Sequence, residues 1–133
     1  MSLVLIATDD FTVYRILAAE VEAEGHEAAW AAEGLEATQL PATKPVALAL
    51  LDPALATFNG FEVCEMLRAD PHVPHELPVF LLTDDEVNPH VRHRIGATGV
   101  FPKTHGAHEV RELLAKHLAH ADLLDQLRAA ISA

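Results

Sequence analysis

Five side chains that could do chemistry each follow a short apolar run of this sequence: Asp9, Asp10, Asp52, Thr83 and Lys103. Each apolar run has the length and bounds of a buried strand. In an open parallel sheet, ligands bind in the crevice outside the carboxyl ends of the strands. We therefore expect these five side chains to converge at one edge of a sheet.

Three carboxylates in one crevice repel each other unless a divalent cation lies between them. Oxygen-only ligation favours Mg²⁺. In this interpretation Asp10 is a direct ligand, Asp9 binds through water, and Asp52 and the carbonyl of Ala54 complete the protein ligands. The sequence therefore predicts a magnesium site.

A carboxylate can also attack a phosphoryl group and form an acyl phosphate. Asp52 is the candidate nucleophile because it stands at the carboxyl end of residues 46–51, an apolar run typical of a strand buried on both faces. Lys103 would neutralise the phosphoryl oxygens, and Thr83 would donate a hydrogen bond to one of them.

The elements that must position these residues alternate between strand and helix. The expected strands are residues 3–7, 27–31, 46–51, 78–82 and 100–103, and the expected helices are 11–24, 34–40, 60–69, a short one after Asn88 and a long one from Ala107. Pro41 is expected to end the second helix, and Pro102 to place the fifth strand at the sheet edge. This order predicts an α/β fold, a doubly wound parallel sheet in three α/β/α layers.

Composition limits the classes of function. The 133 residues suit one compact domain, expected at residues 1–120, and the formal charge of −11 argues against nucleic acid as a direct partner. The single cysteine, Cys64, is expected in the core. No apolar run is long enough for a membrane span, so we expect a cytoplasmic location.

The sequence resembles the response-regulator receiver domains of two-component signalling. The resemblance covers residues 3 to about 120 and rests on Asp9-Asp10, Asp52, Thr83 and Lys103 in order, with Gly60 eight residues beyond Asp52. It implies the flavodoxin-like strand order 2-1-3-4-5. A CheY-like domain of this kind is not a classical enzyme, although it catalyses its own aspartyl phosphorylation and dephosphorylation.

The resemblance also implies partners and a readout. Asp52 would accept a phosphoryl group from a histidine kinase or phosphotransfer protein, with Mg²⁺ as cofactor. Phosphorylation would then shift a conformational equilibrium at an output surface that contacts an effector or output domain. The residues expected in that switch and output surface are Val91, Ile95, Val100 and Phe101.

Three positions depart from the family pattern. Ala56 replaces a proline, Val100 replaces the switch aromatic with Phe101 one position later, and Thr104 replaces the proline of a Lys-Pro pair. The loop at Lys103 must therefore either hold a costly non-proline cis bond or reorganise. The alternative function is a degenerate receiver that acts as a phosphorylation-independent docking module. A phosphatase with an Asp nucleophile ranks lower, because Ala54 stands where its second acid belongs.

The last helix is longer than one sheet face requires, since residues 107–131 would span roughly 37 Å. Its apolar residues recur at helical spacing: Val110, Leu114, Leu118, Ala121, Leu124, Leu127 and Ile131. We expect residues 121–133 to be an extension that links to an output domain or forms a homodimer, with folding back onto the domain as the alternative. Four His-x-x-His pairs, at 72/75, 90/93, 105/108 and 117/120, are expected to be solvated rather than metal-binding.

Overall fold

A computed structural model describes the backbone of residues 1–132, and the side chains of these residues except 120–122, 124 and 125. Five parallel strands form one sheet in the order β2-β1-β3-β4-β5. The strands are β1 (Leu3–Ala7), β2 (Glu27–Ala31), β3 (Val46–Leu51), β4 (Val79–Leu82) and β5 (Gly99–Phe101). The helices are α1 (Phe11–Ala23), α2 (Gly34–Thr43), α3 (Gly60–Ala69), α4 (Pro89–Ile95) and α5 (Ala107–Ser132). The expected fold class and strand order are confirmed.

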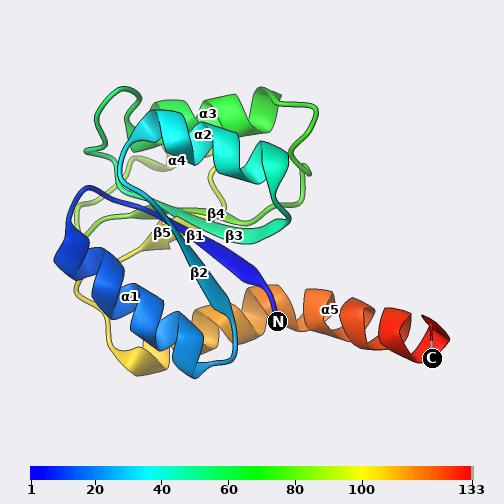
Figure 1. Ribbon diagram of the computed structural model, residues 1–133. Coiled ribbons are helices and arrows are strands. Elements are labelled where there is room, and N and C mark those ends of the chain that lie inside the picture. Colours follow the sequence, from blue (N-terminus) through cyan, green and yellow to red (C-terminus); the bar gives the residue numbers. More distant parts are fainter. Residues whose placement is uncertain (133) are drawn as a thin grey trace.

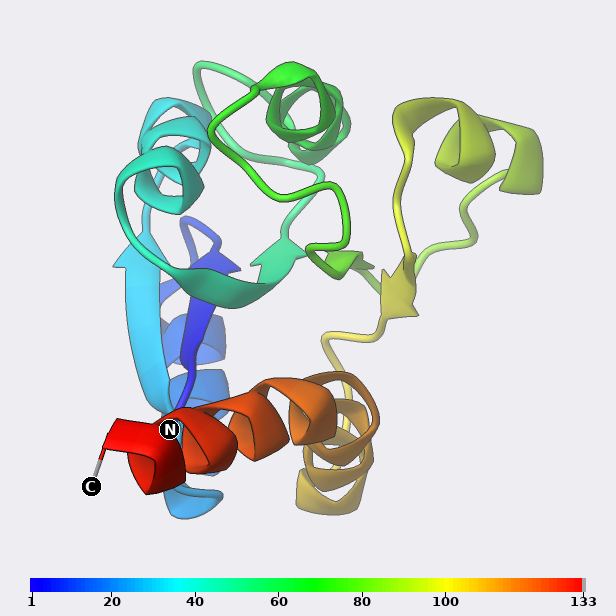
Figure 2. The ribbon, with the colours of Figure 1, turned by 90° about the vertical axis from the view of Figure 1, so that its right-hand side faces the viewer.

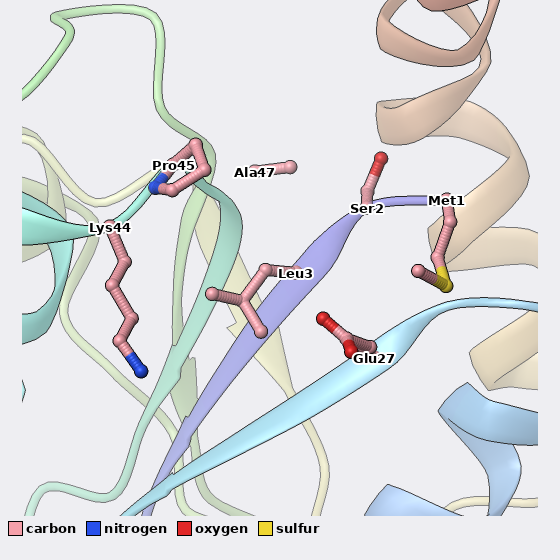
Figure 3. A pocket seen from close by; sticks show the side chains of 7 residues that line it. All are labelled: Met1, Ser2, Leu3, Glu27, Lys44, Pro45 and Ala47. Atoms are coloured by element: carbon pink, nitrogen blue, oxygen red, sulfur yellow. The ribbon is translucent and has the colours of Figure 1, made fainter.

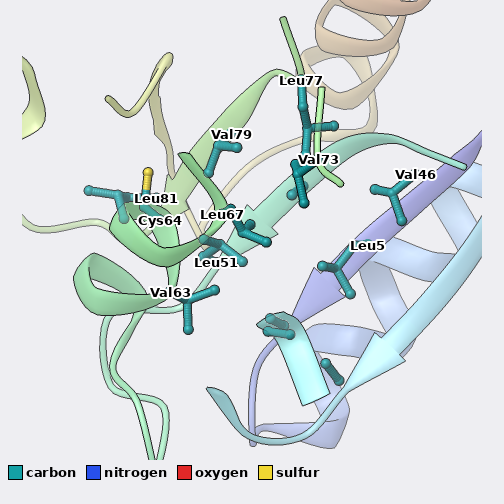
Figure 4. Packing of buried hydrophobic residues seen from close by; sticks show 14 of the residues in the cluster. Leu5, Val46, Leu51, Val63, Cys64, Leu67, Val73, Leu77, Val79 and Leu81 are labelled. Atoms are coloured by element: carbon teal, nitrogen blue, oxygen red, sulfur yellow. The ribbon is translucent and has the colours of Figure 1, made fainter. Parts of the chain in front are cut away.

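The helices cover both faces of the sheet. α1 and α5 lie on one face, and α2, α3 and α4 lie on the other (Figures 1 and 2). Because alternate strand residues point to opposite faces, β1 directs Leu5 and Ala7 to one layer and Val4 and Ile6 to the other. Figure 4 shows the first of these layers, where side chains of the strands pack against α3.

Cys64 lies in that layer and is fully buried, as expected. Its thiol donates a hydrogen bond to the carbonyl of Ile95 at 3.3 Å. Burial raises the pKa of the Cys64 thiol to about 11. The residue is therefore a packing residue and not a reactive thiol.

Two of the expected boundaries were wrong by more than one residue. Helix α2 does not end at Pro41 but continues through it to Thr43. The helix continues past Pro41 because residues after the proline still donate i to i−4 hydrogen bonds. The N–H of Lys44, for example, donates to the carbonyl of Leu40 at 2.9 Å. Strand β5 ends at Phe101 and not at residue 103, so Lys103 lies in the loop that follows. The edge position of β5 is confirmed.

Helix α5 extends well past the sheet, and its last turns project away from the other elements (Figure 1). Val110, Leu114 and Leu118 are buried against the sheet. Beyond them, Leu123, Leu127 and Ile131 are exposed. The expected stripe residues Ala121 and Leu124 lie outside the residues whose side chains are described. Among residues 1–132, no helix has both the length and the apolar character that a bilayer crossing requires.

Candidate functional site

Asp52 lies directly after β3, and only 2% of its side chain is exposed. Its backbone N–H donates to the carbonyl of Ala7 at 2.8 Å, which continues the pairing of β3 with β1. Its Oδ1 accepts the N–H of Ala54 at 2.9 Å, and its Oδ2 lies 2.8 Å from Nζ of Lys103. A buried carboxylate requires such partners, because burial without them is costly.

Thr8 is a third partner of Asp52, and the sequence analysis missed it. Its hydroxyl donates to Oδ2 of Asp52 at 3.0 Å and accepts the N–H of Asp10 at 3.2 Å. Thr8 has no exposed surface, whereas Asp9 and Asp10 are both exposed. Its place in the sequence could have indicated this role, because Thr8 is the first residue after β1 just as Asp52 is the first after β3.

The two acidic residues after β1 have different positions, because Asp9 precedes the N-cap of α1 and Asp10 is that N-cap. Asp10 is the N-cap of α1, and its Oδ1 accepts the N–H groups of Thr12 at 2.9 Å and Val13 at 3.2 Å. This is a structural role that aspartate often takes. The expected role of Asp10 as a direct metal ligand therefore has to share that carboxylate with the helix terminus.

Thr83 and Lys103 come from the ends of the two strands beyond Asp52. The backbone N–H of Thr83 donates to the carbonyl of Phe101 at 3.0 Å. The Thr83 hydroxyl accepts the N–H of Asp85 at 3.1 Å, so its own hydrogen remains able to donate. Lys103 reaches Asp52 with a side chain that is 33% exposed.

The loop between Asp52 and α3 is fastened to α2. The N–H of Gly34 donates to the carbonyl of Ala56 at 2.9 Å, and the N–H of Leu35 donates to Oγ1 of Thr57 at 3.0 Å. The departure at Ala56 thus leaves the loop attached through its backbone. At the other end of the loop, a Cβ on Gly60 would lie 2.6 Å from the carbonyl oxygen of Asp52. Only glycine allows this close approach.

The loop at Lys103 reorganises rather than adopting a cis bond. The peptide bonds of the described residues are all trans. Thr104, where the family pattern has proline, donates to Oδ1 of Asp84 through its N–H at 3.0 Å and its hydroxyl at 2.8 Å. These donors lower the pKa of the Asp84 carboxyl from its ordinary 3.8. Proline could supply neither bond.

The four residues expected in the switch and output surface differ in exposure. Val100 is 37% exposed and Val91 is half-buried, whereas Ile95 and Phe101 are buried at 1% and 6%. Ile95 and Phe101 therefore do not contribute surface in this state. The ring of Phe101 lies 5.0 Å from that of His105. Their part in a switch stays a prediction.

The acidic residues at this edge of the sheet fit Mg²⁺ in the type of their donor atoms. Asp9, Asp10 and Asp52 provide only oxygen ligands, and Lys103 offsets one of three negative charges. In the described part of the chain, however, no three His, Cys, Asp or Glu side chains gather in a metal-binding group. The His-x-x-His pair at 105/108 diverges, because His105 contacts Glu20 and His108 contacts Glu112. The expectation that His105 is solvated was wrong, since only 2% of its side chain is exposed.

A pocket of about 490 Å³ lies at the opposite edge of the sheet, around the amino ends of β1, β2 and β3 (Figure 3). Its lining residues are Met1, Ser2, Leu3, Glu27, Lys44, Pro45 and Ala47. None of the residues that surround Asp52 lines it. The candidate site is therefore the carboxyl edge and not this pocket.

Comparison with known proteins identifies one family. Residues 4–127 match the family described as response regulator receiver domain. The chain is 25% identical over 122 residues to the alkaline phosphatase synthesis transcriptional regulatory protein PhoP of Bacillus subtilis, covering 90% of this chain and 50% of that protein. The chain thus spans about half the length, or less, of the curated relatives it matches.

Solved structures show the same fold. The chemotaxis protein CheY4 of Vibrio cholerae superposes with a TM-score of 0.80 at 23% identity, covering 89% of this chain and 99% of that chain. The receiver domain of a sensor histidine kinase from Pseudomonas aeruginosa PAO1 gives a TM-score of 0.79 at 17% identity, covering 89% and 98%. The latter has a magnesium ion coordinated in its active-site cleft.

Proposed function

Because the chain belongs to the response regulator receiver domains of two-component signalling, we propose that it is a phosphoacceptor whose Asp52 receives a phosphoryl group with Mg²⁺ as cofactor. The observation that carries this proposal is the contact of Asp52 with Lys103, at 2.8 Å and with Asp52 almost completely buried. A nucleophilic carboxylate beside a lysine, at the carboxyl edge of a parallel sheet, suits transfer of an anionic group.

In the proposed reaction an oxygen of Asp52 attacks the phosphorus of a phosphodonor. A new P–O bond forms an acyl phosphate, and the bond to the leaving group breaks with its electron pair. For a phosphohistidine donor the leaving imidazole takes up a proton. Lys103 stays beside the phosphoryl oxygens, and the free hydrogen of the Thr83 hydroxyl binds one of them. Water would later attack the same phosphorus and restore Asp52.

Thr8 and the N–H of Ala54 hold the carboxylate of Asp52 in one orientation. Positioning of this kind lowers the barrier because the reacting oxygen is already aligned. Asp52, the acidic pair Asp9 and Asp10, and the carbonyl of Ala54 would hold Mg²⁺. When bound, the ion neutralises charge on the transferring oxygens.

The partners follow from the proposed reaction. We expect a histidine kinase or phosphotransfer protein to supply the phosphoryl group in the cytoplasm, and an effector or output domain to recognise the phosphorylated state. Val100 is the exposed residue at the proposed output surface. The exposed Leu123, Leu127 and Ile131 on α5 are compatible with a linker or a homodimer formed by residues 121–133.

A degenerate receiver that acts only as a docking module is the second candidate. Two observations favour it: both oxygens of the Asp52 carboxylate already have partners, and Asp10 is used as a helix cap. Such a domain would keep the fold and lose the phosphoryl chemistry.

Intact-mass measurement separates the two candidates. The protein is incubated with acetyl phosphate and Mg²⁺, beside Asp52→Asn and beside a chelator control. We expect one added phosphoryl group that is absent from both controls. If the mass is unchanged in every sample, and a beryllofluoride complex also fails to form while Mg²⁺ binds, the docking module is the better description.

A further inference from the structure

The loop of residues 102–105, which follows β5, carries Lys103 and is tied to the domain through the two residues after that lysine. On one side of the loop, Thr104 bonds to Asp84 in the loop after β4. On the other side, His105 bonds to Glu20 of α1. The second attachment joins two titratable side chains that take no part in the proposed phosphoacceptor reaction.

The His105 side chain is buried, with 2% exposed, and both of its ring nitrogens face acceptors. Nε2 lies 2.7 Å from Oε2 of Glu20, whose side chain is 19% exposed. Nδ1 lies 3.0 Å from the carbonyl oxygen of Pro102, the residue directly before Lys103. His105 therefore connects the backbone beside Lys103 to α1 through a single ring.

The two contacts require an additional proton. A backbone carbonyl only accepts hydrogen bonds, and so does an ionised carboxylate. A neutral imidazole carries one N–H, so one ring nitrogen would direct a lone pair at an acceptor. Both contacts are satisfied when His105 is an imidazolium, or when Glu20 carries the proton and donates it to Nε2. In either arrangement the pair holds one proton more than a neutral histidine beside a carboxylate.

We propose that His105 and Glu20 are a positioning pair that fixes Lys103 beside Asp52, and that the pair does so only while it holds this additional proton. When the proton is lost, one of the two ring nitrogens directs a lone pair at its acceptor, and that contact opens. His105 then no longer joins the Pro102 carbonyl to Glu20, and Lys103 has more freedom. The effect on phosphorylation rests on the proposed function, whereas the effect on Lys103 does not.

Other charged groups near the pair are already engaged in contacts of their own. Four residues beyond Glu20, at the C-cap of α1, Glu24 accepts from Nε of Arg111 on α5 at 2.7 Å. On α5, His108 lies 2.9 Å from Glu112, and both are exposed. Within the loop itself, Lys103 faces Asp52. Glu24 is thus a matched control, because it is a second acid on the same helix that pairs with α5.

Two substitutions at Glu20 separate the proton from the contact. In Glu20→Gln the amide can donate to the lone pair of a neutral imidazole, so the contact persists without the additional proton. In Glu20→Ala the contact is absent at every pH. Glu24→Gln leaves the pair unchanged and reports on the loss of a carboxylate from α1.

The first experiment follows the backbone amide of Lys103 and the ring of His105 by NMR between about pH 5 and 8.5, the range in which histidines change charge. In the unsubstituted protein we expect the Lys103 amide to shift together with the His105 ring. This shared transition should vanish in Glu20→Gln and persist in Glu24→Gln. In Glu20→Ala the Lys103 amide should stay at its high-pH position throughout. If the pH dependence of the Lys103 amide shift is unchanged in both Glu20 variants, the proposal is overturned.

The second experiment measures the rate of phosphorylation by acetyl phosphate across the same pH range. At each pH the rate of each protein is divided by the rate of Glu24→Gln. We expect Glu20→Ala to be slower by about fivefold at low pH, the size of one hydrogen bond, and equal to the unsubstituted protein at high pH. Superimposable profiles would contradict the proposal. If no protein is phosphorylated at any pH, the proposed function fails, and the NMR arm still decides the positioning role.

Discussion

The hydroxyl of Thr8 donates a hydrogen bond to Oδ2 of Asp52 at 3.0 Å, between the ends of the neighbouring strands β1 and β3. The same oxygen faces Nζ of Lys103 at 2.8 Å. Two donors from opposite sides thus hold one carboxylate oxygen in place. Because neither Thr8 nor Asp52 is appreciably exposed, this bond forms in a region from which water is largely excluded.

We expect Thr8→Val to slow phosphorylation of Asp52 by acetyl phosphate about fivefold, since one hydrogen bond contributes about 1 kcal/mol. Valine keeps the branched shape and removes only the donor. Thr8→Ser retains the hydroxyl and should keep most of the rate. Initial rates of phosphoryl incorporation, measured by intact mass, provide the comparison. Equal rates for the valine and serine variants would show that the bond to Asp52 has no role in the reaction.

Asp9 and Asp10 should differ in their effects on magnesium. Asp10→Asn retains a side-chain oxygen that can cap α1, so we expect stability to be preserved. Asp10→Ala removes the cap and should lower the free energy of unfolding by about 1 kcal/mol. Urea unfolding measures both changes.

Magnesium affinity, measured by calorimetry on the same variants, then tests the ligand role. Because Oδ1 of Asp10 already accepts two backbone N–H groups, we expect Asp9→Asn to weaken binding more than Asp10→Asn. The reverse order would mean that Asp10 is the direct ligand and that capping is secondary.

Gly60 should tolerate no side chain. A Cβ at this position would lie 2.6 Å from the carbonyl oxygen of Asp52 and 2.9 Å from its carbonyl carbon. We expect Gly60→Ala to shift the backbone of Asp52, lower the free energy of unfolding by about 1 to 3 kcal/mol and slow phosphorylation. Gly106→Ala is the matched control, because a Cβ there has nothing within 4 Å. An unchanged Asp52 amide resonance in Gly60→Ala would argue against the backbone shift.

Periodicity and strand-end placement were sufficient to predict the α/β fold class and the convergence of Asp52 with Lys103, whereas the strand order came from the family resemblance. Those features depend on apolar patterning and on parallel topology, which local sequence expresses directly. The role of Thr8 was not predictable in the same way, because a threonine after a strand carries no distinctive signal. Its importance comes from register: Ala7 pairs with Leu51, and Thr8 and Asp52 are the residues that follow this pair on the two strands.

The attachment of the Lys103 loop was also out of reach of the sequence analysis. The absence of proline at Thr104 showed that the loop must change, but not how. Its partner Asp84 lies 20 residues away along the chain, and only the tertiary structure brings the two together. The same holds for His105 and Glu20, which are 85 residues apart. Pairings across that separation depend on how the helices pack on the sheet.

Acidification should release the Thr104 attachment of the Lys103 loop. The N–H and hydroxyl of Thr104 lower the pKa of Asp84 from its ordinary 3.8, so the carboxylate is favoured in the folded protein. A lowered pKa means that the contribution to stability is present above 3.8 and is lost as the pH falls through the folded value. We expect the Thr104 amide resonance to move with Asp84 as the pH falls below about 4.

In Asp84→Asn that movement should be absent, because the amide oxygen still accepts from Thr104 but does not titrate. Asp70 is the internal reference for the titration of an aspartate that accepts a backbone N–H. Its pKa is likewise lowered, chiefly by the N–H of His72, in a loop remote in sequence from Lys103. A Thr104 amide that still follows pH in Asp84→Asn would show that another group titrates there, and the attachment would then need a different acceptor.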